Sequence, residues 1–284
     1  MKKSHATFYS LLMVFSLSAC GSASLTLEEG LATAQGIQNY QNSENFNHPN
    51  NLTISLYTEI NKPLASLNNP LISEVTRDFV IDMNHSYFYS YTYSYVLVNT
   101  IPAGSSNQVR KATKTTTKQW VYLDDDVLYT VDDSLIFIDD DTVGNETKTY
   151  QSQIIDVAND STFTNLLASL YNYYTGYDAL NYLIGDSENS SDGYFDEGYV
   201  SDNRSTTIKS EGDGSLETEI IIKKSIPPYT FNYDLKAKFS NYYLSSYFYY
   251  WVNDYQYSKT KLSVSHETNR SYPNLNDYTL ETDN

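Results

Sequence analysis

The sequence predicts an α+β fold: one curved antiparallel sheet, a half-open barrel, with an N-terminal helix and mid-chain helices packed on its concave face. Apolar and polar residues alternate with period two over most of the chain, and helical spacing occurs only near its start and its middle. Strands and helices do not alternate regularly, so nothing demands a parallel sheet. Twist accumulates across a sheet this long, and we therefore expect it to curl.

The first predicted element is a helix over 26–40. Thr26 has the side chain of an N-cap, and Glu28 and Glu29 follow in the first turn, where the helix dipole favours carboxylates. A modest apolar stripe continues to about Tyr40, and the polar turn at 47–50 ends the helix. Strands with alternating apolar residues are predicted at 52–60 and 79–83.

A long strand with a tyrosine face follows. Five tyrosines recur at every second position, and small, mostly hydroxylated residues lie between them. Period two sustained this long predicts an extended β-ribbon with one aromatic face. The five residues are Tyr87, Tyr89, Tyr91, Tyr93 and Tyr95.

An antiparallel meander with acidic turns is predicted next. Three short apolar runs occupy 120–123, 127–131 and 135–138. Aspartates separate them at 124–126 and 132–133, and such clusters are typical of turns.

The middle of the chain changes to helical spacing. Apolar residues from Phe163 to Tyr174 form one continuous stripe, which predicts a single helix with Asp160 or Ser161 as N-cap and Gly176 as its stop. A second, shorter helix is expected over 177–184, ended by Gly185.

Strands resume in the last third of the chain. Residues 229–239 alternate without error between apolar and polar positions, which predicts a strand with one buried face. Residues 242–257 are aromatic on both faces, so this strand is expected to be central. Further strands are predicted at 216–223 and 262–266, and the tail at 271–284 is polar.

The N-terminus reads as a leader peptide. Lys2 and Lys3 precede an apolar stretch at 8–17 that is too short to span a membrane, and the only cysteine, Cys20, follows Leu-Ser-Ala. This segment resembles the lipobox of bacterial lipoproteins, which implies cleavage before Cys20 and acylation of its thiol. An ordinary secretory signal that contains a cysteine is the alternative.

We expect four segments and one location for the chain. They are a signal peptide at 1–19, a lipid-anchored tether at 20–25, one domain at 26–270 and the polar tail at 271–284. The protein is expected on the extracytoplasmic side of the cell membrane, with the membrane contacted through lipidated Cys20. No second cysteine is present, so no internal disulfide can form.

Charge and composition limit the function. The chain carries a net charge of −17, and loss of Lys2 and Lys3 with residues 1–19 makes it −19. Such a chain repels nucleic acid and anionic lipid, so we expect no nucleic-acid partner and an anchor made of acyl chains. Tyrosine is unusually frequent, with 29 residues against 11 Phe and 2 Trp. These rings either fill a β-rich core or line a ligand surface.

The order of helix, strand meander, helical pair and second meander resembles the lipoprotein-carrier fold. That fold is shared by outer-membrane lipoprotein carriers and by lipid-binding surface lipoproteins of mycobacteria. The resemblance covers about 26–270, and it implies a half-open barrel that holds acyl chains between sheet and helices.

No catalytic, cofactor or metal motif stands out. The acidic runs at 139–150 and 188–199 begin like calcium loops, but Tyr150 and Tyr199 replace the final glutamate. No nucleophile or zinc motif occurs in a supporting context, and nothing marks two carboxylates as a catalytic pair. We therefore expect no enzyme activity, no cofactor and no metal.

Two functions remain. The first is a binder of a hydrophobic or amphipathic ligand, held in the groove between the 163–174 helix and the sheet. The second is a structural or adhesive surface lipoprotein that binds carbohydrate or protein through a tyrosine-rich sheet face. Residues expected to line the groove, unless they are ordinary core, are Phe163, Leu167, Leu170 and Tyr174 on the helix, facing Phe231 and Tyr233 on the sheet.

Overall fold

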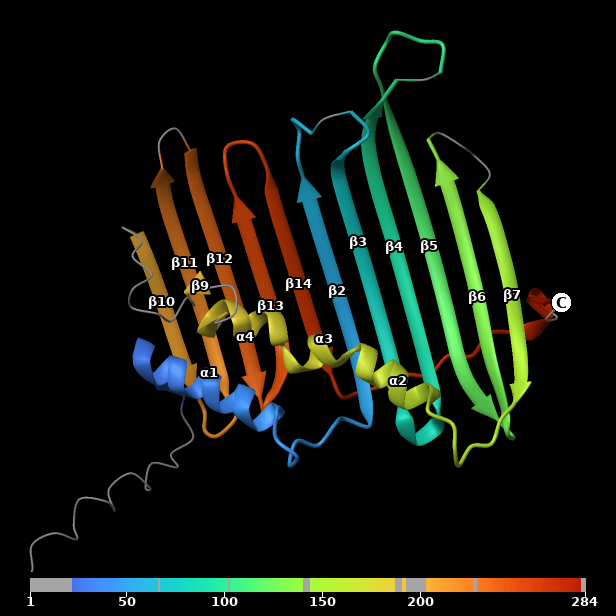
Figure 1. Ribbon diagram of the computed structural model, residues 1–284, viewed down its shortest axis with the longest axis horizontal. Coiled ribbons are helices and arrows are strands. Elements are labelled where there is room, and N and C mark those ends of the chain that lie inside the picture. The colour runs from blue at the N-terminus through green and yellow to red at the C-terminus, as the bar shows by residue number, and fades with distance from the viewer. Residues whose placement is uncertain are drawn as a thin grey trace, which may run out of the picture.

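One large sheet dominates the protein. The computed structural model describes residues 22–65, 67–101, 103–139, 144–186, 191–192, 203–226 and 229–281. In these residues, thirteen strands form a single curved sheet that does not close on itself (Figure 1). Neighbouring strands are antiparallel, except that β15 runs parallel to β7. The predicted large, curved, unclosed antiparallel sheet with few helices is therefore confirmed.

The two halves of the chain meet in the middle of this sheet. The strand order is β1-β10-β11-β12-β13-β14-β2-β3-β4-β5-β6-β7-β15, so β14 from the end of the chain pairs with β2 from its beginning. A separate pair is formed by β8 (Gly185–Asp186) and β9 (Ser191–Asp192). The strands of the large sheet are β1 (Ala23–Ser24), β2 (Asn51–Asn61), β3 (Pro70–Asp82), β4 (Tyr87–Thr100), β5 (Val109–Asp124), β6 (Val127–Ile138), β7 (Asn145–Ile154), β10 (Asn203–Ser210), β11 (Leu216–Ile226), β12 (Tyr229–Ser240), β13 (Tyr243–Val252), β14 (Tyr257–Ser265) and β15 (Thr279–Leu280).

The N-terminal helix begins as the sequence predicts. α1 (Leu27–Gln41) has Thr26 as its N-cap, and the Glu29 backbone N–H donates to Thr26 Oγ1 at 3.3 Å. The Glu29 carboxylate in turn accepts the Thr26 backbone N–H at 2.8 Å. This capping box satisfies donors that have no partner within the helix.

The 163–174 stretch contains two helices where the sequence predicts one. α2 (Thr162–Ser169) ends at Leu170, whose N–H donates to Leu167 O at 3.0 Å, and α3 (Tyr171–Thr175) follows at once. Ser161 occupies the N-cap position, but its side chain makes no capping bond. Periodicity alone does not reveal this break, because the apolar stripe runs through it.

Gly176 separates α3 from α4 (Tyr177–Ile184), which ends at Gly185 as predicted. Gly176 has a φ of +65°, and a Cβ there would lie 3.0 Å from the side chains of Leu244 and Phe239. Glycine suits this position both in conformation and in size.

Side chains alternate between the two faces of the sheet. One face, here called the helix face, carries the main hydrophobic core under the helices. The opposite face, here called the tyrosine face, carries the tyrosines of β4, because they occur at every second position from Tyr87 and are out of phase with the core residue Phe88. Core residues of the helix face that are at most 1% exposed include Leu52, Ile54, Ile81, Leu235 and Phe239.

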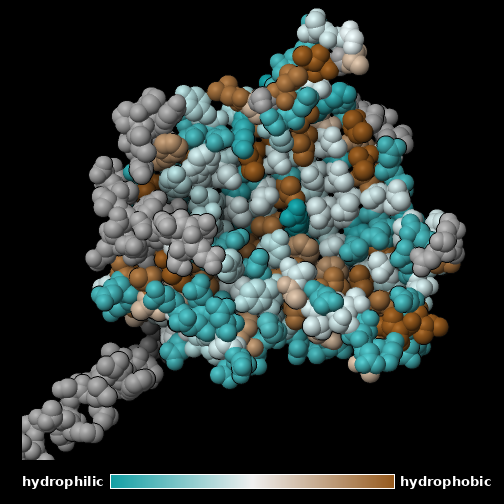
Figure 2. All heavy atoms as spheres, viewed as in Figure 1, coloured by the Kyte–Doolittle hydropathy of each residue, from teal (hydrophilic) through white to brown (hydrophobic). Residues whose placement is uncertain are grey.

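The helices lie in a row across the strands and cover one end of the sheet (Figure 1). α1 packs on β10 and β11 and against α4, α2 lies on β3 and β4, and α3 lies on β13 and β14. Beyond this row, hydrophilic residues and scattered apolar ones form the surface of the sheet (Figure 2). No described helix covers that part of the helix face.

β6 is one strand, and the turn predicted at 132–133 was wrong. Asp132 and Asp133 lie in the middle of the strand, opposite Gln119 and Lys118 of β5. Gln119 Nε2 donates to Asp132 Oδ1 at 3.0 Å, and Lys118 Nζ lies 3.5 Å from Asp133 Oδ2. The cross-strand partners accommodate both carboxylates, and the local sequence does not reveal them.

The C-terminal segment crosses the tyrosine face. After β14 it runs behind the strands of Figure 1, forms the short 3-10 helix η2 (Leu275–Asp277), and reaches the edge strand β7. There Thr279 and Leu280 of β15 pair with Thr149 and Tyr150. The polar tail predicted at 271–284 therefore lies on the sheet as far as it is described.

Candidate binding surfaces

Four of the six side chains predicted to line a groove belong to the core. Phe163 and Leu167 of α2 are each 8% exposed, Leu170 is 2% exposed, and Tyr174 of α3 is fully buried. All four belong to the cluster that joins the helices to the helix face. They are in contact with protein and leave little surface for a ligand.

The other two, Phe231 and Tyr233, lie on β12. Both rings contact Trp251 of β13, with centroid distances of 6.4 and 6.5 Å. α2 rests on β3 and β4, and three strands separate β12 from β3. The structure therefore does not bring the six side chains together in one groove, because α2 lies over the centre of the sheet and not over β12.

Tyr174 shows how tightly this interface is packed. Its hydroxyl lies 2.7 Å from His48 Nδ1, and its ring contacts the imidazole edge to face. Burial raises the pKa of Tyr174, with smaller effects from Tyr171 and Tyr243. The hydroxyl is thus a structural hydrogen-bonding group.

The lipidation and calcium predictions concern parts of the chain that are largely undescribed. Cys20 and the leader at 1–19 lie outside the described residues, as do 140–143 of the first acidic run and 188–190 and 193–199 of the second. The part of the chain that is described has no helix long and apolar enough to cross a membrane. It also has no group of three or more His, Cys, Asp or Glu side chains placed to hold a metal ion.

The tyrosine stripe of β4 lies where the sequence predicts it, on one face of a long strand. Tyr91, Tyr93 and Tyr95 are each half-buried. Every ring has a polar or charged residue directly opposite on each neighbouring strand. The pairs are Asp78 and Lys118 beside Tyr91, Thr76 and Thr116 beside Tyr93, and Glu74 and Lys114 beside Tyr95.

A row of aromatic rings crosses the strands at right angles to this stripe. Phe248 of β13, Tyr57 of β2 and Tyr93 of β4 occupy one register line, with Lys261 and Thr76 between them. The rings therefore occur on alternate strands, which places them about 10 Å apart. All three side chains are half-buried.

A carboxylate beside this row organises hydroxyl and ammonium groups. Glu59 accepts hydrogen bonds from Tyr57 at 3.0 Å and from Tyr257, and Lys259 Nζ lies 3.9 Å away. Lys259 also lies over the Tyr57 ring, 5.8 Å from its centroid. Burial and the neighbouring Glu59 raise the pKa of Tyr57 to about 12. These contacts offset the repulsion between Glu59 and Glu74, which lie directly opposite each other.

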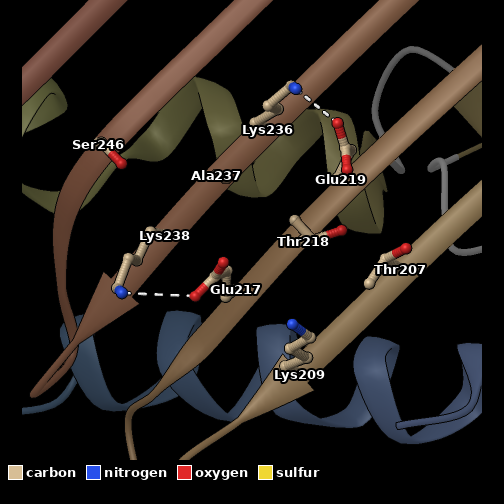
Figure 3. Close-up of a pocket in the computed structure, with 9 residues that line it drawn as sticks. All are labelled: Thr207, Lys209, Glu217, Thr218, Glu219, Lys236, Ala237, Lys238 and Ser246. Carbon is tan, nitrogen blue, oxygen red and sulfur yellow. Dashed lines mark ion pairs between the residues drawn. The ribbon is translucent and has the colours of Figure 1, made fainter. Parts of the chain in front are cut away.

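The same face continues as a charged hollow over β10–β13. In Figure 3 the helices lie behind the strands, and lysines alternate with glutamates in front of them. Lys236 pairs with Glu219 at 2.5 Å, and Lys238 pairs with Glu217 at 3.4 Å. The hollow has a volume of about 280 Å³. The charges of Lys236 and Lys238 are therefore balanced by these two glutamates.

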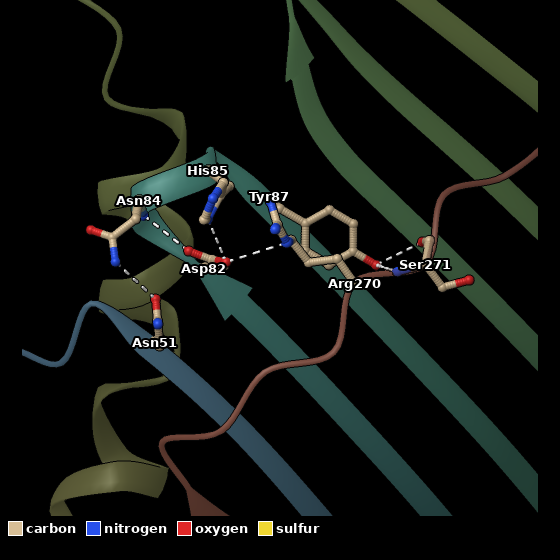
Figure 4. Close-up of polar contacts among 7 residues, drawn as sticks. All are labelled: Asn51, Asp82, Asn84, His85, Tyr87, Arg270 and Ser271. Atoms are coloured by element: carbon tan, nitrogen blue, oxygen red, sulfur yellow. Dashed lines mark hydrogen bonds and ion pairs between the residues drawn. The ribbon is translucent and has the colours of Figure 1, made fainter.

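At its other end, the tyrosine face is held under the C-terminal segment (Figure 4). The Asp82 side chain, which is 4% exposed, lies 2.8 Å from His85 Nδ1 and 3.5 Å from Arg270 Nε. The Tyr87 hydroxyl donates to Ser271 O at 2.8 Å and accepts the Ser271 N–H at 3.1 Å. The Asp82–Arg270 ion pair and the two Tyr87–Ser271 hydrogen bonds thus hold the C-terminal segment against the sheet.

Aromatic rings continue this contact. Tyr272 packs edge to face on Tyr87 and Tyr122, and Tyr278 packs on Trp120. Tyr87, Trp120, Tyr122 and Val131 form a second hydrophobic cluster on the side of the sheet opposite the helices, and Leu275 and Tyr278 of the C-terminal segment pack against it. The tyrosine face is therefore partly covered at this end.

Sequence reasoning found the β4 stripe but not the row across the strands. The stripe is visible because period two is local to one strand. The row needs the register of β14 on β2, and these two strands are about 200 residues apart in sequence. The only local hint is that Tyr57 is in phase with the polar residues Ser55 and Glu59, which places its ring on the side of the strand away from the core.

Comparison of the chain with protein-family models, with curated proteins and with solved structures found no match in any of the three.

Proposed function

We propose that this protein is a lipid-anchored, non-catalytic surface protein that binds an extended carbohydrate polymer through its tyrosine face. Lipidated Cys20 would hold it on the extracytoplasmic side of the cell membrane. The observation that carries the proposal is the row formed by Phe248, Tyr57 and Tyr93 on alternate strands. Aromatic rings offer flat apolar faces to sugar rings, and the groups between them can bond hydroxyls.

The spacing of the row fits a polymer. Alternate strands place the rings about 10 Å apart, which is close to the length of a disaccharide. A chain that crosses the strands would meet Phe248, Tyr57 and Tyr93 in turn. Lys261 and Thr76, between the rings, offer hydrogen-bond donors to its hydroxyl groups.

The charge pattern favours carbohydrate over a protein partner. Lysine and glutamate are depleted from the centres of protein–protein interfaces, because both are costly to desolvate. On the tyrosine face they stand directly beside the rings, as Glu74 and Lys114 do beside Tyr95. A hydrated polyol can contact such groups without stripping them of water.

Carriage of a hydrophobic or amphipathic ligand is the less supported function. It requires an open cavity between α2, α3 and the sheet, and Leu167, Leu170 and Tyr174 fill that space. We further propose that the sheet is a half-open barrel of the lipoprotein-carrier type, with the helices on its concave side. The order of its elements supports that relationship.

The test is depletion of the protein from solution by insoluble polysaccharides. Cellulose, chitin and peptidoglycan would be incubated with the protein, and the unbound fraction measured. We expect saturable binding to at least one polymer. Tyr93→Ser should lower the affinity about tenfold, because an aromatic side chain that stacks on a ligand ring, as in proteins that bind single-stranded nucleic acids, contributes about 1–3 kcal/mol of binding free energy.

The matched control is Tyr177→Ser, which removes a ring that is 49% exposed on α4, on the helix face. It should bind like the wild type. Equal losses in the two variants, or no binding to any polymer, would contradict the proposal.

A further inference from the structure

A groove on the helix face is separate from the tyrosine face. It lies between α4 and strands β13 and β14 and has a volume of about 420 Å³. Asp178, Asn181 and Tyr182 line its helix side. Because they are three and four residues apart, they project from one face of α4.

The sheet side of the groove is aromatic and hydroxylated. Tyr247 and Tyr249 line it from β13, and Thr260 lies directly opposite Tyr249 on β14. The Tyr182 ring stacks on Tyr249, with centroids 5.1 Å apart and planes inclined by 13°. Tyr182 remains 42% exposed, so part of its surface faces the groove and solvent.

The charge of the groove lining is negative. Asp178 is the only charged residue among the described residues that line the groove, and no lysine, arginine or histidine is among them. Burial raises the pKa of Tyr182, and the negative charge of Asp178 adds to this effect. The carboxylate field therefore reaches the ring, and the chain as a whole carries a net charge of −17.

These features select a class of ligand. An anion would meet Asp178 without any compensating cation, and an alkyl chain would leave the carboxylate and amide unsatisfied. Every polar lining group, including the Thr260 hydroxyl and the Asn181 carbonyl, can accept a hydrogen bond. An ammonium group carries a positive charge that attracts the carboxylate and the aromatic faces alike, whether it has N–H donors or, when quaternary, only alkyl groups.

We propose that this groove binds an organic ammonium ion, with the cation between the Asp178 carboxylate and the ring of Tyr182. A bare metal ion would find a single carboxylate and would make no use of the rings, whereas alkyl groups on an ammonium pack on them. The site lies on the other side of the sheet from the carbohydrate surface proposed above, and it does not depend on that function.

The test is calorimetric titration of the full-length protein in nonionic detergent with choline, and with its neutral isostere 3,3-dimethylbutan-1-ol. We expect saturable binding of choline and binding of the neutral isostere at least about fivefold weaker, since a carboxylate and a ring face each favour the cation. Added sodium chloride should weaken choline binding, because the attraction is partly screened.

Variants separate the two contributions. Asp178→Asn should weaken choline binding by about fivefold and remove most of its preference over the isostere. Tyr182→Leu should weaken it similarly, whereas Tyr182→Phe should retain it, because only the ring is needed. Tyr93→Ser, on the opposite face, should leave choline binding unchanged.

Three results would overturn the proposal: no saturable binding of choline, equal binding of choline and the isostere, or wild-type affinity in Asp178→Asn. If Tyr182→Leu fails to fold, the comparison of Asp178→Asn with Tyr182→Phe decides alone. Binding of glucose that is insensitive to Asp178→Asn would identify a neutral sugar site instead.

Discussion

At the residue scale, the hydroxyl groups of Tyr57 and Tyr122 are partly withdrawn from solvent. Burial raises the pKa of both Tyr57 and Tyr122 to about 12, and the nearby Glu59 adds to the effect for Tyr57. A phenol that keeps its proton more tightly in the folded state than in the unfolded state couples folding to pH. That coupling gives a measurable signature of how these two rings are placed.

We predict that stability falls as the pH rises from 10 to 12. The ordinary pKa of tyrosine is 10.0, so the unfolded chain loses these protons first, and the stabilisation present below pH 10 is lost as the pH passes through the folded value of about 12. Urea unfolding between pH 9 and 12 measures this slope. Tyr57→Phe and Tyr122→Phe should each flatten it, and a pH-independent stability would refute the placement.

Leu167 tests the packing of α2. We predict that Leu167→Asp lowers the free energy of unfolding by roughly 3–5 kcal/mol, because the carboxylate would replace a side chain that is 8% exposed. Ala168→Asp, on the exposed side of the same helix, should lower it by only about 1 kcal/mol, because aspartate has a lower helix propensity than alanine and lies near the negative end of the helix dipole. Equal melting temperatures for the two variants would show that α2 is not docked.

At the scale of elements, the local sequence predicts where a helix or strand begins and ends better than it predicts which strands that element pairs with or packs on. Thr26 and Glu29 mark the start of α1 in the sequence, and Gly176 marks the end of α3. The interior position of β13 also follows from its aromatic residues on both faces.

The features that the sequence did not predict depend on which strands and helices lie beside each other. Asp132 and Asp133 resemble a turn until Gln119 and Lys118 are placed opposite them. The groove predicted from Leu167 to Tyr233 assumed that α2 lies over β12, and the spacing of apolar residues does not state which strands a helix crosses. The tyrosine stripe was predictable because it lies within one strand, whereas the ring row depends on the register of five neighbouring strands.

Gly176 and Gly36 form a matched pair of element-scale tests. We predict that Gly176→Ala destabilises the protein by more than about 1 kcal/mol, since its φ is +65° and a Cβ would crowd Leu244 and Phe239. Gly36 lies inside α1, and no atom lies within 4 Å of its added Cβ. Gly36→Ala should therefore stabilise by up to about 1 kcal/mol. Thermal unfolding compares them, and the reverse order would contradict the assigned backbone.

At the scale of the whole molecule, the sheet has two faces with different roles. The helix face carries the main core, so the fold depends on it. The tyrosine face carries the second, smaller cluster under the C-terminal segment, and elsewhere it presents rings among charges. Anchoring by Cys20 through a short tether would leave both faces accessible at the membrane surface.

The anchor is tested by Cys20→Ala. We predict that the variant is found in the soluble fraction, whereas the wild type sediments with membranes, because two or three acyl chains anchor a protein stably and a −19 chain has no electrostatic attraction to anionic lipid. Globomycin should block maturation of the wild type. Processing that is insensitive to globomycin would refute lipidation.

The central claim is that the tyrosine face is the binding surface, and hydroxyl-radical footprinting with mass spectrometry tests it most directly. The protein would be labelled with and without a bound polysaccharide. Binding through the ring row predicts that Phe248, Tyr57 and Tyr93 are protected by the polymer, while Tyr177 on the helix face is labelled equally in both states. Protection of Tyr177 with unchanged labelling of the ring row would contradict the account.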